Sequence, residues 1–172
     1  MKALITGRPG IGKSYVTQGL AARGLQAYDL EEIPGVIRLE VKETGEPAEW
    51  PDGFVDWNYY AWRIQAGPLR KFLDALNGDV YVSGSANNQT DFYGLFDKIL
   101  VLTLDDPEVL RHRLETRNVH KHGQGPENID RAVNRFLSKQ TDLLALGGIA
   151  IDNSRPLNEV LDHIVEVTHD SQ

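Results

Sequence analysis

Short apolar runs alternate along the chain with segments in which apolar residues recur at helical spacing. The short runs predict strands and the periodic segments predict helices. The predicted strands are residues 2–6, 25–29, 79–84, 98–104 and 148–152, and the predicted helices are residues 13–23, 57–77, 107–117, 127–146 and 156–168. The strands lack strict polar alternation, which is typical of strands buried on both faces. The pattern therefore predicts an α/β fold of three layers, a parallel sheet between two layers of helices.

Two segments depart from this alternation. Gly67-Pro68 interrupts the predicted helix 57–77, and we expect a break there with Pro68 starting the second part. Residues 30–56 fit the alternation poorly, but a partly alternating stretch before Thr44-Gly45 predicts a hairpin. We interpret this segment as an insertion at the rim of the sheet, where functional loops tend to lie. No repeat, low-complexity tract or linker is visible, so residues 1–172 predict one domain.

Composition narrows the classes of partner. The 172 residues carry a net charge of −7, which argues against nonspecific binding to nucleic acid or to an anionic membrane. The absence of cysteine excludes disulfides and thiolate metal sites. The N-terminus has too short an apolar stretch for a signal peptide, and no apolar run approaches the roughly 20 residues that span a bilayer. We therefore expect a cytoplasmic protein.

The sequence GRPGIGKS, residues 7–14, matches the pattern G-x-x-x-x-G-K-[ST] between a predicted strand and a predicted helix. Glycines let successive backbone N–H groups converge on phosphate oxygens, and the start of the helix adds unpaired N–H groups. A chance glycine-rich turn explains this context poorly. The pattern predicts that Lys13 reaches the β- and γ-phosphates of ATP and that Ser14 ligates Mg²⁺. The nucleotide-binding residues predicted here are Gly7, Arg8, Pro9, Gly10, Ile11, Gly12, Lys13, Ser14 and Tyr15.

From Gly7 to Ser14, and from Ser83 to the end, the chain resembles P-loop small-molecule kinases of the nucleotide-kinase and shikimate-kinase type. Residues 96–118 resemble the fourth strand of those kinases, an Asp-Pro-capped helix and the entry to a lid. Residues 151–164 resemble their last strand, adenine-contacting loop and final helix. The resemblance implies a five-stranded sheet in the order 2-3-1-4-5 and a helical lid over residues 117–127. It also implies that Arg117, Arg155 and Pro156 lie near the nucleotide.

Pairs of arginines flank the expected lid. Arg113 and Arg117 are four residues apart and share a helix face, as do Arg131 and Arg135. Arginines neutralise the charge of a transferring phosphoryl group. We therefore predict a catalytic Arg117, a nucleotide-binding Arg113 and an acceptor-binding Arg135. The alternative is that each lies on the solvated face of an amphipathic helix.

Asp29 closes the second predicted strand. The resemblance implies that an aspartate at this position contacts the acceptor hydroxyl or the metal, and carboxylates suit both tasks. Asp29 is therefore predicted as a catalytic residue, an acceptor ligand and a metal ligand. The alternatives are that it caps the following segment or that Glu31 or Glu32 takes its place.

Further acceptor contacts are predicted from two clusters. All three tryptophans, with Phe54, Tyr59 and Tyr60, lie between residues 50 and 62, where they either stack on a planar acceptor or form a satellite core. Polar residues after strand 79–84 either bind a ligand at the sheet edge or cap a helix. The acceptor-binding residues predicted from these clusters are Trp62, Arg63, Asn87, Asn88 and Gln89.

The chain also departs from the family that it resembles. Strand 79–84 ends in Ser83-Gly84-Ser85, without the Walker-B aspartate, so Asp29 is the natural second metal-linked carboxylate. The glycine triplet and acceptor arginine motif of shikimate kinases are missing, as is the threonine-arginine pattern of adenylate kinases. We predict an ATP-dependent phosphotransferase whose acceptor is a small molecule, preferably a nucleoside or nucleotide. The alternative is a nucleotide-dependent switch or binding protein with slow hydrolysis.

Overall fold

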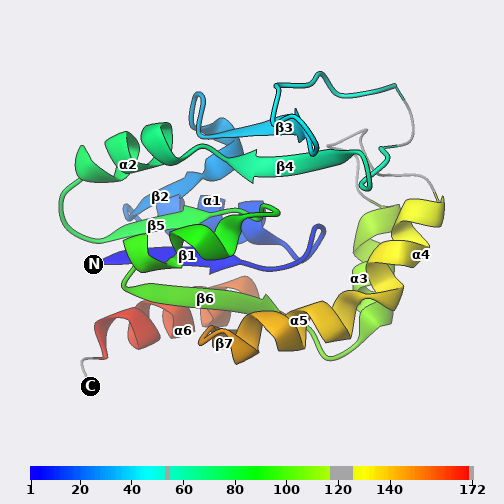
Figure 1. Ribbon diagram of the computed structural model, residues 1–172. Coiled ribbons are helices and arrows are strands. Elements are labelled where there is room, and N and C mark those ends of the chain that lie inside the picture. The colour runs from blue at the N-terminus through cyan, green and yellow to red at the C-terminus, as the bar shows by residue number, and fades with distance from the viewer. Residues whose placement is uncertain (53–54, 117–125, 171–172) are drawn as a thin grey trace.

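The computed structural model describes residues 1–52, 55–116 and 126–170, and a parallel sheet forms its centre (Figure 1). Five strands make up this sheet: β1 (Lys2–Thr6), β2 (Gln26–Asp29), β5 (Val80–Ser83), β6 (Lys98–Thr103) and β7 (Ile149–Asp152). All of them were predicted to within one residue at each end. The three central strands, β5, β1 and β6, are mostly buried, so both faces of the sheet must be covered there, whereas the outer strands β2 and β7 are largely only partly buried.

The strand order is β2-β5-β1-β6-β7. These labels differ from the predicted 2-3-1-4-5 because two additional strands, β3 (Ile37–Val41) and β4 (Tyr60–Ile64), intervene in the sequence and form a separate antiparallel pair. Counted among the strands of the main sheet alone, the order is the predicted one. β1 therefore lies in the middle, with the end that leads into residues 7–14 at the carboxyl edge.

Two hydrophobic clusters form the core, one on each face of the main sheet. Alternate residues of β1 divide between them: Ala3 and Ile5 belong to one cluster and Leu4 to the other. The first cluster includes buried residues of α1 (Lys13–Ala22), α3 (Pro107–Glu115), α4 (Pro126–Asn134) and α6 (Leu157–His169). The second includes residues of α2 (Ala66–Asp74), the 3₁₀ segments η1 (Leu30–Glu32) and η2 (Gln89–Leu95), and α5 (Phe136–Ala145). The predicted three-layer α/β class is confirmed.

The predicted helix 57–77 is wrong in its first half. Residues 60–64 form β4, and α2 begins only at Ala66. Tyr60 to Ile64 pair with β3 in antiparallel register, so a tertiary partner decides the local structure. Gly67-Pro68 does not break a helix, because it lies in the first turn of α2, where a missing N–H leaves no intrahelical bond unmade.

The expected hairpin in residues 30–56 is found in part. The chain reverses at Thr44-Gly45, where Gly45 has φ of +72° and the backbone N–H of Val41 donates to the oxygen of Glu46 at 2.9 Å. Pro47 then forms an isolated bridge with Glu40. The main partner of β3 is nevertheless β4, from outside the predicted segment. The β3–β4 pair lies above the main sheet on the side of α2 in Figure 1.

The predicted helix 127–146 is two helices, α4 and α5, which meet at Arg135. Arg135 has φ of −101° and ψ of 3°, outside the helical region, and is the N-cap of α5. The predicted lid, residues 117–127, and with it Arg117, falls almost entirely outside the described residues. Among the helices that the structure describes, none has the length and apolar character needed to cross a membrane.

Candidate functional site

The loop of residues 7–14 connects β1 to α1 and depends on two glycines for its shape. Gly10 has φ of +83° and Gly12 has φ of +109°, a region that other residues rarely adopt. A Cβ on Gly10 would lie 2.5 Å from Leu114 Cδ2, and one on Gly12 would lie 2.8 Å from Asn153 Nδ2. Both the backbone conformation and the close packing therefore require glycine here.

The first turn of α1 presents positive charge at the loop. Gly12 is the N-cap of α1 without a side-chain cap, and the first turn carries no acidic residue. The ammonium group of Lys13 donates to the backbone oxygens of Gly7 at 3.1 Å and Arg8 at 3.2 Å. Unpaired N–H groups, the positive end of the helix and this ammonium together form an environment suited to phosphate.

Ser14 and Asp29 meet beside this turn. Ser14 Oγ donates to Asp29 Oδ2 at 2.9 Å, while Asp29 Oδ1 accepts from the backbone N–H of Glu31 at 3.1 Å. One oxygen of Asp29 thus caps η1, as the capping interpretation expected. The other oxygen contacts Ser14, which is also the position that a metal ligand would need. Glu31 and Glu32 are exposed and lie in η1 itself.

These two oxygens fit a magnesium ion. Mg²⁺ usually takes one or two protein oxygens, together with phosphate oxygens and several waters. A hydroxyl and a carboxylate beside a phosphate-binding loop supply the protein's share of such a shell. Within the described ranges, no group of three His, Cys, Asp or Glu side chains is placed to hold a metal ion by itself.

Arg113, on α3, holds the loop through hydrogen bonds to backbone oxygens. Its Nη1 donates to the backbone oxygen of Ile11 at 2.8 Å and its Nη2 to that of Asn153 at 3.1 Å. The side-chain amide of Asn153 also donates to Ile11 O, at 2.5 Å. Burial lowers the pKa of Arg113 from its usual value. Sequence reasoning assigned this arginine to the nucleotide; the hydrogen bonds show that it holds the loop, and direct contact with a nucleotide stays a prediction.

Arg8 and Arg135 bring additional positive charge to the loop. Arg8 Nε is buried without a hydrogen-bond partner in the part of the chain that the structure describes. Burial lowers the pKa of Arg8, and repulsion from Arg135 lowers it further. Phe136, next to Arg135, belongs to the same core cluster as Ile11 of the loop.

No carboxylate of the described residues pairs with either guanidinium, and residues 117–125 contain no aspartate or glutamate. The charge of Arg8 and Arg135 is therefore one that a bound anion would neutralise.

The remaining nucleotide contacts predicted from the sequence lie at the edge of this region. Arg155 Nε pairs with Asp152 Oδ2 at 3.1 Å, and Pro156 directly precedes α6. Hydrogen bonds from Ser154 lower the pKa of Asp152, and Arg155 lowers it further. Tyr15 is exposed. The predicted contacts of these residues with a nucleotide stay predictions.

The amides that follow β5 fasten the β3–β4 pair to the main sheet. Asn88 Oδ1 accepts from the backbone N–H of Ile64 at 2.9 Å, and its Nδ2 donates to the oxygen of Ile64 at 3.0 Å. Asn87 Oδ1 accepts from the backbone N–H of Trp62 at 2.7 Å, and the backbone N–H of Asn87 donates to Trp62 O at 2.8 Å. Asn87 and Asn88 thus bond to the backbone of β4 much as a neighbouring strand would, and they hold β4 close to the carboxyl edge of the main sheet.

Gln89 is buried, and both ends of its side-chain amide make hydrogen bonds within the protein. Its Oε1 accepts from Thr6 Oγ1 at 3.0 Å and from the backbone N–H of Ala86 at 3.2 Å. Its Nε2 donates to the hydroxyl of Tyr93 at 3.0 Å. The three amides thus have structural partners, and their predicted contacts with an acceptor stay predictions.

Trp62 and Arg63 point to opposite faces of β4, because successive side chains alternate along a strand. The ring of Trp62 lies 5.1 Å from that of Trp50, which lies 6.2 Å from that of Trp57. The tryptophans therefore contact one another, but none of them is fully buried or belongs to a core cluster, so the satellite core and the stacking of an acceptor both stay predictions. A single pocket on one face of β4 cannot use both Trp62 and Arg63.

The face that carries Arg63 contains a charged cluster that sequence reasoning missed. Glu40 is buried, and its Oε1 accepts from Arg38 Nε and from Gln65 Nε2, each at 2.8 Å. Arg63 Nε lies 3.7 Å from Glu40 Oε2. Arg38 and Arg63 are partners in the strand register, so two guanidinium groups share one carboxylate. The alternation of apolar and charged residues in VIRLEV was the available signal.

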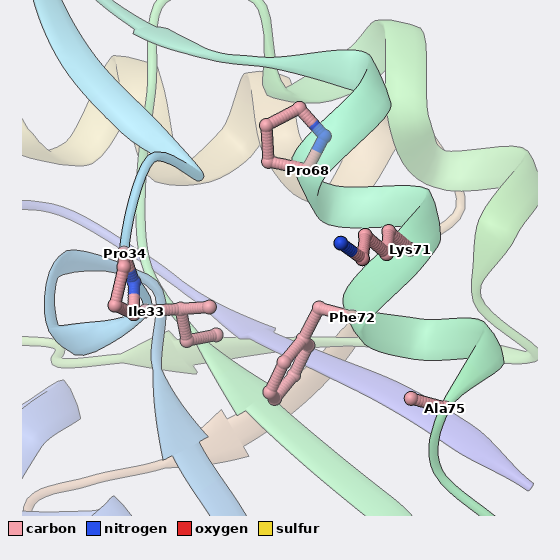
Figure 2. A pocket seen from close by; sticks show the side chains of 6 residues that line it. All are labelled: Ile33, Pro34, Pro68, Lys71, Phe72 and Ala75. Atoms are coloured by element: carbon pink, nitrogen blue, oxygen red, sulfur yellow. The ribbon is translucent and has the colours of Figure 1, made fainter.

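A separate groove lies between η1 and α2. Figure 2 shows its lining, which is mostly apolar: Ile33, Pro34, Pro68, Lys71, Phe72 and Ala75. None of these residues was predicted to bind a nucleotide or an acceptor, and the groove contains none of the loop residues.

Comparison with known proteins defines the fold. No family model matches the chain. No curated protein matches it either. A solved structure of shikimate kinase from Bacteroides thetaiotaomicron is similar with a TM-score of 0.57 and 16% sequence identity, over 98% of each chain. A gluconokinase from Sinorhizobium meliloti 1021 is similar with a TM-score of 0.51 and 15% identity, over 96% of this chain and 89% of that chain. The chain therefore has the fold of P-loop small-molecule kinases, and identities this low carry nothing beyond the fold.

Proposed function

We propose that the protein transfers the γ-phosphoryl group of Mg·ATP to a small-molecule acceptor. The observation that carries this proposal is the 2.9 Å hydrogen bond between Ser14 and Asp29. It joins a hydroxyl at the start of α1, next to a phosphate-binding loop, to a carboxylate at the end of the adjacent strand β2. A kinase needs both groups at this point, one for the metal and one for the metal or the attacking hydroxyl.

Each residue of the site has a distinct task in this proposal. The loop amides and Lys13 bind the phosphates, with Lys13 exchanging the carbonyls of Gly7 and Arg8 for phosphate oxygens. Asp29 orients the acceptor hydroxyl and receives its proton. Bound Mg²⁺ would be held by Ser14 and Asp29, and it would supply charge neutralisation at the β- and γ-phosphates. Arg8 and Arg135, without acidic partners among the described residues, neutralise the charge of the group in transfer.

We infer that the acceptor carries an anionic group, so that of the nucleosides and nucleotides a nucleotide is preferred. Glu40 compensates only one of the two charges on Arg38 and Arg63, and both guanidinium groups are partly exposed, at 44% and 41% of their side chains. The pair β3–β4 that carries them is fastened to the loop after β5 at the carboxyl edge of the sheet. Ligands of open α/β sheets bind at this edge.

A thermal-shift screen tests this proposal. Matched nucleosides, nucleoside monophosphates and sugar acids are tested with and without a nonhydrolysable ATP analogue. We expect stabilisation by an anionic compound that increases when the analogue is present, and ADP release that depends on the same compound. The variant Lys13→Ala is the control, because it should remove nucleotide binding while the protein stays folded.

The rival function is a nucleotide-dependent switch with slow hydrolysis, which the absence of an aspartate at the end of β5 favours. Slow ADP release that no acceptor accelerates would support the switch and count against the transferase. Unchanged nucleotide affinity in Lys13→Ala would refute both.

A further inference from the structure

The end of β5 holds a polar group that the proposed function has not used. Ser83 is fully buried, and its Oγ has no hydrogen-bond partner among the residues that the structure describes. A buried hydroxyl without a partner costs about 1–3 kcal/mol, so such groups in folded proteins usually have water or a ligand as their partner. Ser83 stands where the sequence lacks the expected Walker-B aspartate.

The strand register places Ser83 beside the proposed metal ligands. It is the partner of Asp29 on β2 and of Ile5 on β1. Register partners in a parallel ladder share a face of the sheet, and neighbouring strands lie about 4.8 Å apart. Tyr81, two residues earlier on β5, packs on this face with Val16 of α1. Ser83 therefore lies on the face that α1 covers, one strand from the carboxylate that Ser14 contacts.

The chain around Ser83 is fixed in position. The backbone N–H of Gly84 donates to Ile5 O at 3.0 Å, which keeps the end of β5 paired with the strand before the phosphate loop. A Cβ on Gly84 would lie 2.6 Å from Leu30 Cδ1, so this residue cannot carry a side chain. Ser83 is the last residue of β5, and the glycine that follows it offers no side-chain polar atom.

We propose that the hydroxyl of Ser83 binds a water molecule of the hydrated Mg²⁺ and so takes the part of the missing carboxylate. This inference rests on the proposed function, because it needs a Mg·nucleotide complex at Ser14 and Asp29. Mg²⁺ keeps several of its waters in such complexes, and each water needs an acceptor. A hydroxyl can accept one of these hydrogen bonds, and Ser83 Oγ has no other partner within residues 1–52, 55–116 and 126–170. Ser83 is a positioning residue, since it acts on the metal through water.

The test compares ADP affinity with Mg²⁺ and with EDTA by isothermal titration calorimetry, for the native protein, Ser83→Ala and Ser85→Ala. Ser83→Ala removes one atom that has no hydrogen-bond partner in the described part of the chain, so the variant should fold with a Tm equal to or above the native one. We expect the gain in affinity that Mg²⁺ provides to fall about tenfold in Ser83→Ala, the scale of losses when outer-shell partners of a metal are removed. Affinity for ADP in EDTA should not change. Ser85→Ala, two residues further on and partly exposed, should resemble the native protein.

An unchanged effect of Mg²⁺ in Ser83→Ala would overturn the inference and identify Ser83 as a buried serine without a role at the metal. In that case, a loss of ADP binding in Lys13→Ala would still support the proposed function. If the native protein binds no ADP with or without Mg²⁺, both proposals fail. Manganese in place of magnesium gives a second readout, because electron paramagnetic resonance of the Mn·ADP complex reports its hydration and should differ between the native protein and Ser83→Ala.

Discussion

The guanidinium group of Arg113 donates a 2.8 Å hydrogen bond to the backbone oxygen of Ile11, inside the phosphate loop. Its second bond, to Asn153 O at 3.1 Å, ties the same arginine to the turn that precedes α6. Two elements far from the loop in sequence therefore hold it in shape. A preformed loop does not lose conformational entropy when the phosphates bind, which improves affinity.

We predict that Arg113→Ala lowers both the stability and the nucleotide affinity of the protein. Two charge-assisted hydrogen bonds are lost, which should cost about 2 kcal/mol in the free energy of unfolding, since Asn153 O loses this donor while Ile11 O keeps the bond from Asn153 Nδ2. Urea denaturation measures this change, and calorimetry with ADP measures the affinity. Arg111→Ala is the matched control, because Arg111 pairs with Glu108 and Asp130 at the surface and should change little. Equal losses in the two variants would contradict the role of Arg113 as a support for the loop.

We predict that Gly10→Ala reduces ADP affinity by at least about tenfold, whereas Gly24→Ala does not. Both glycines have similar backbone angles, with φ of +83° and +81°, so both variants carry a strain of about 1 kcal/mol. A Cβ at Gly10 would lie 2.5 Å from Leu114 Cδ2, but one at Gly24 would have no atom within 4 Å. The difference in ADP affinity between the two variants therefore measures how much a displacement of the loop by Leu114 weakens phosphate binding. Equal affinities in calorimetry would show that Leu114 yields without moving the loop.

The main sheet could be predicted because its information is local. The strand β6 contains a short apolar run, and Asp106-Pro107 after it begins α3, where the side chain of Asp106 accepts from Glu108 N at 2.9 Å. The phosphate loop was equally visible, since its glycines, Lys13 and Ser14 form a contiguous pattern. The meeting of Ser14 and Asp29 followed from parallel strands whose carboxyl ends share one edge.

The insertion could not be predicted because its partners are distant in sequence. Residues 60–64 become a strand only by pairing with β3, and the amides of Asn87 and Asn88 satisfy the other edge of that strand. A helical pattern and a strand pattern were both compatible with YAWRI, and the choice depended on tertiary contacts. The same limit applies to Arg113, whose bonds to backbone oxygens leave no trace in side-chain spacing.

We predict that Glu40→Gln destabilises the protein and weakens binding of an anionic acceptor. Without the carboxylate, the guanidinium groups of Arg38 and Arg63 repel each other and lose the group that orients them. Breaking a fully buried pair costs about 3–5 kcal/mol, and the partial exposure of both arginines reduces this to about 1–2 kcal/mol. Urea unfolding measures the loss, and Glu43→Gln, at an exposed position three residues away, is the control. A variant with native stability and undiminished acceptor binding would show that Glu40 does not organise the arginines.

We predict that Asp29→Asn reduces phosphoryl transfer far more than ATP affinity. An asparagine keeps an oxygen that can accept from Glu31 N, so the cap of η1 survives while the negative charge is lost. Loss of a positioned proton acceptor typically reduces turnover about 100-fold or more, whereas the loop amides and Lys13 continue to bind the phosphates. Acceptor-dependent ADP release gives kcat, and calorimetry with ATP gives the affinity. Glu31→Gln, in the exposed first turn of η1, serves as the control and should leave both quantities unchanged. If Asp29→Asn loses affinity and turnover equally, the carboxylate acts only as a metal ligand or in the fold, and the proton must leave the acceptor by another route.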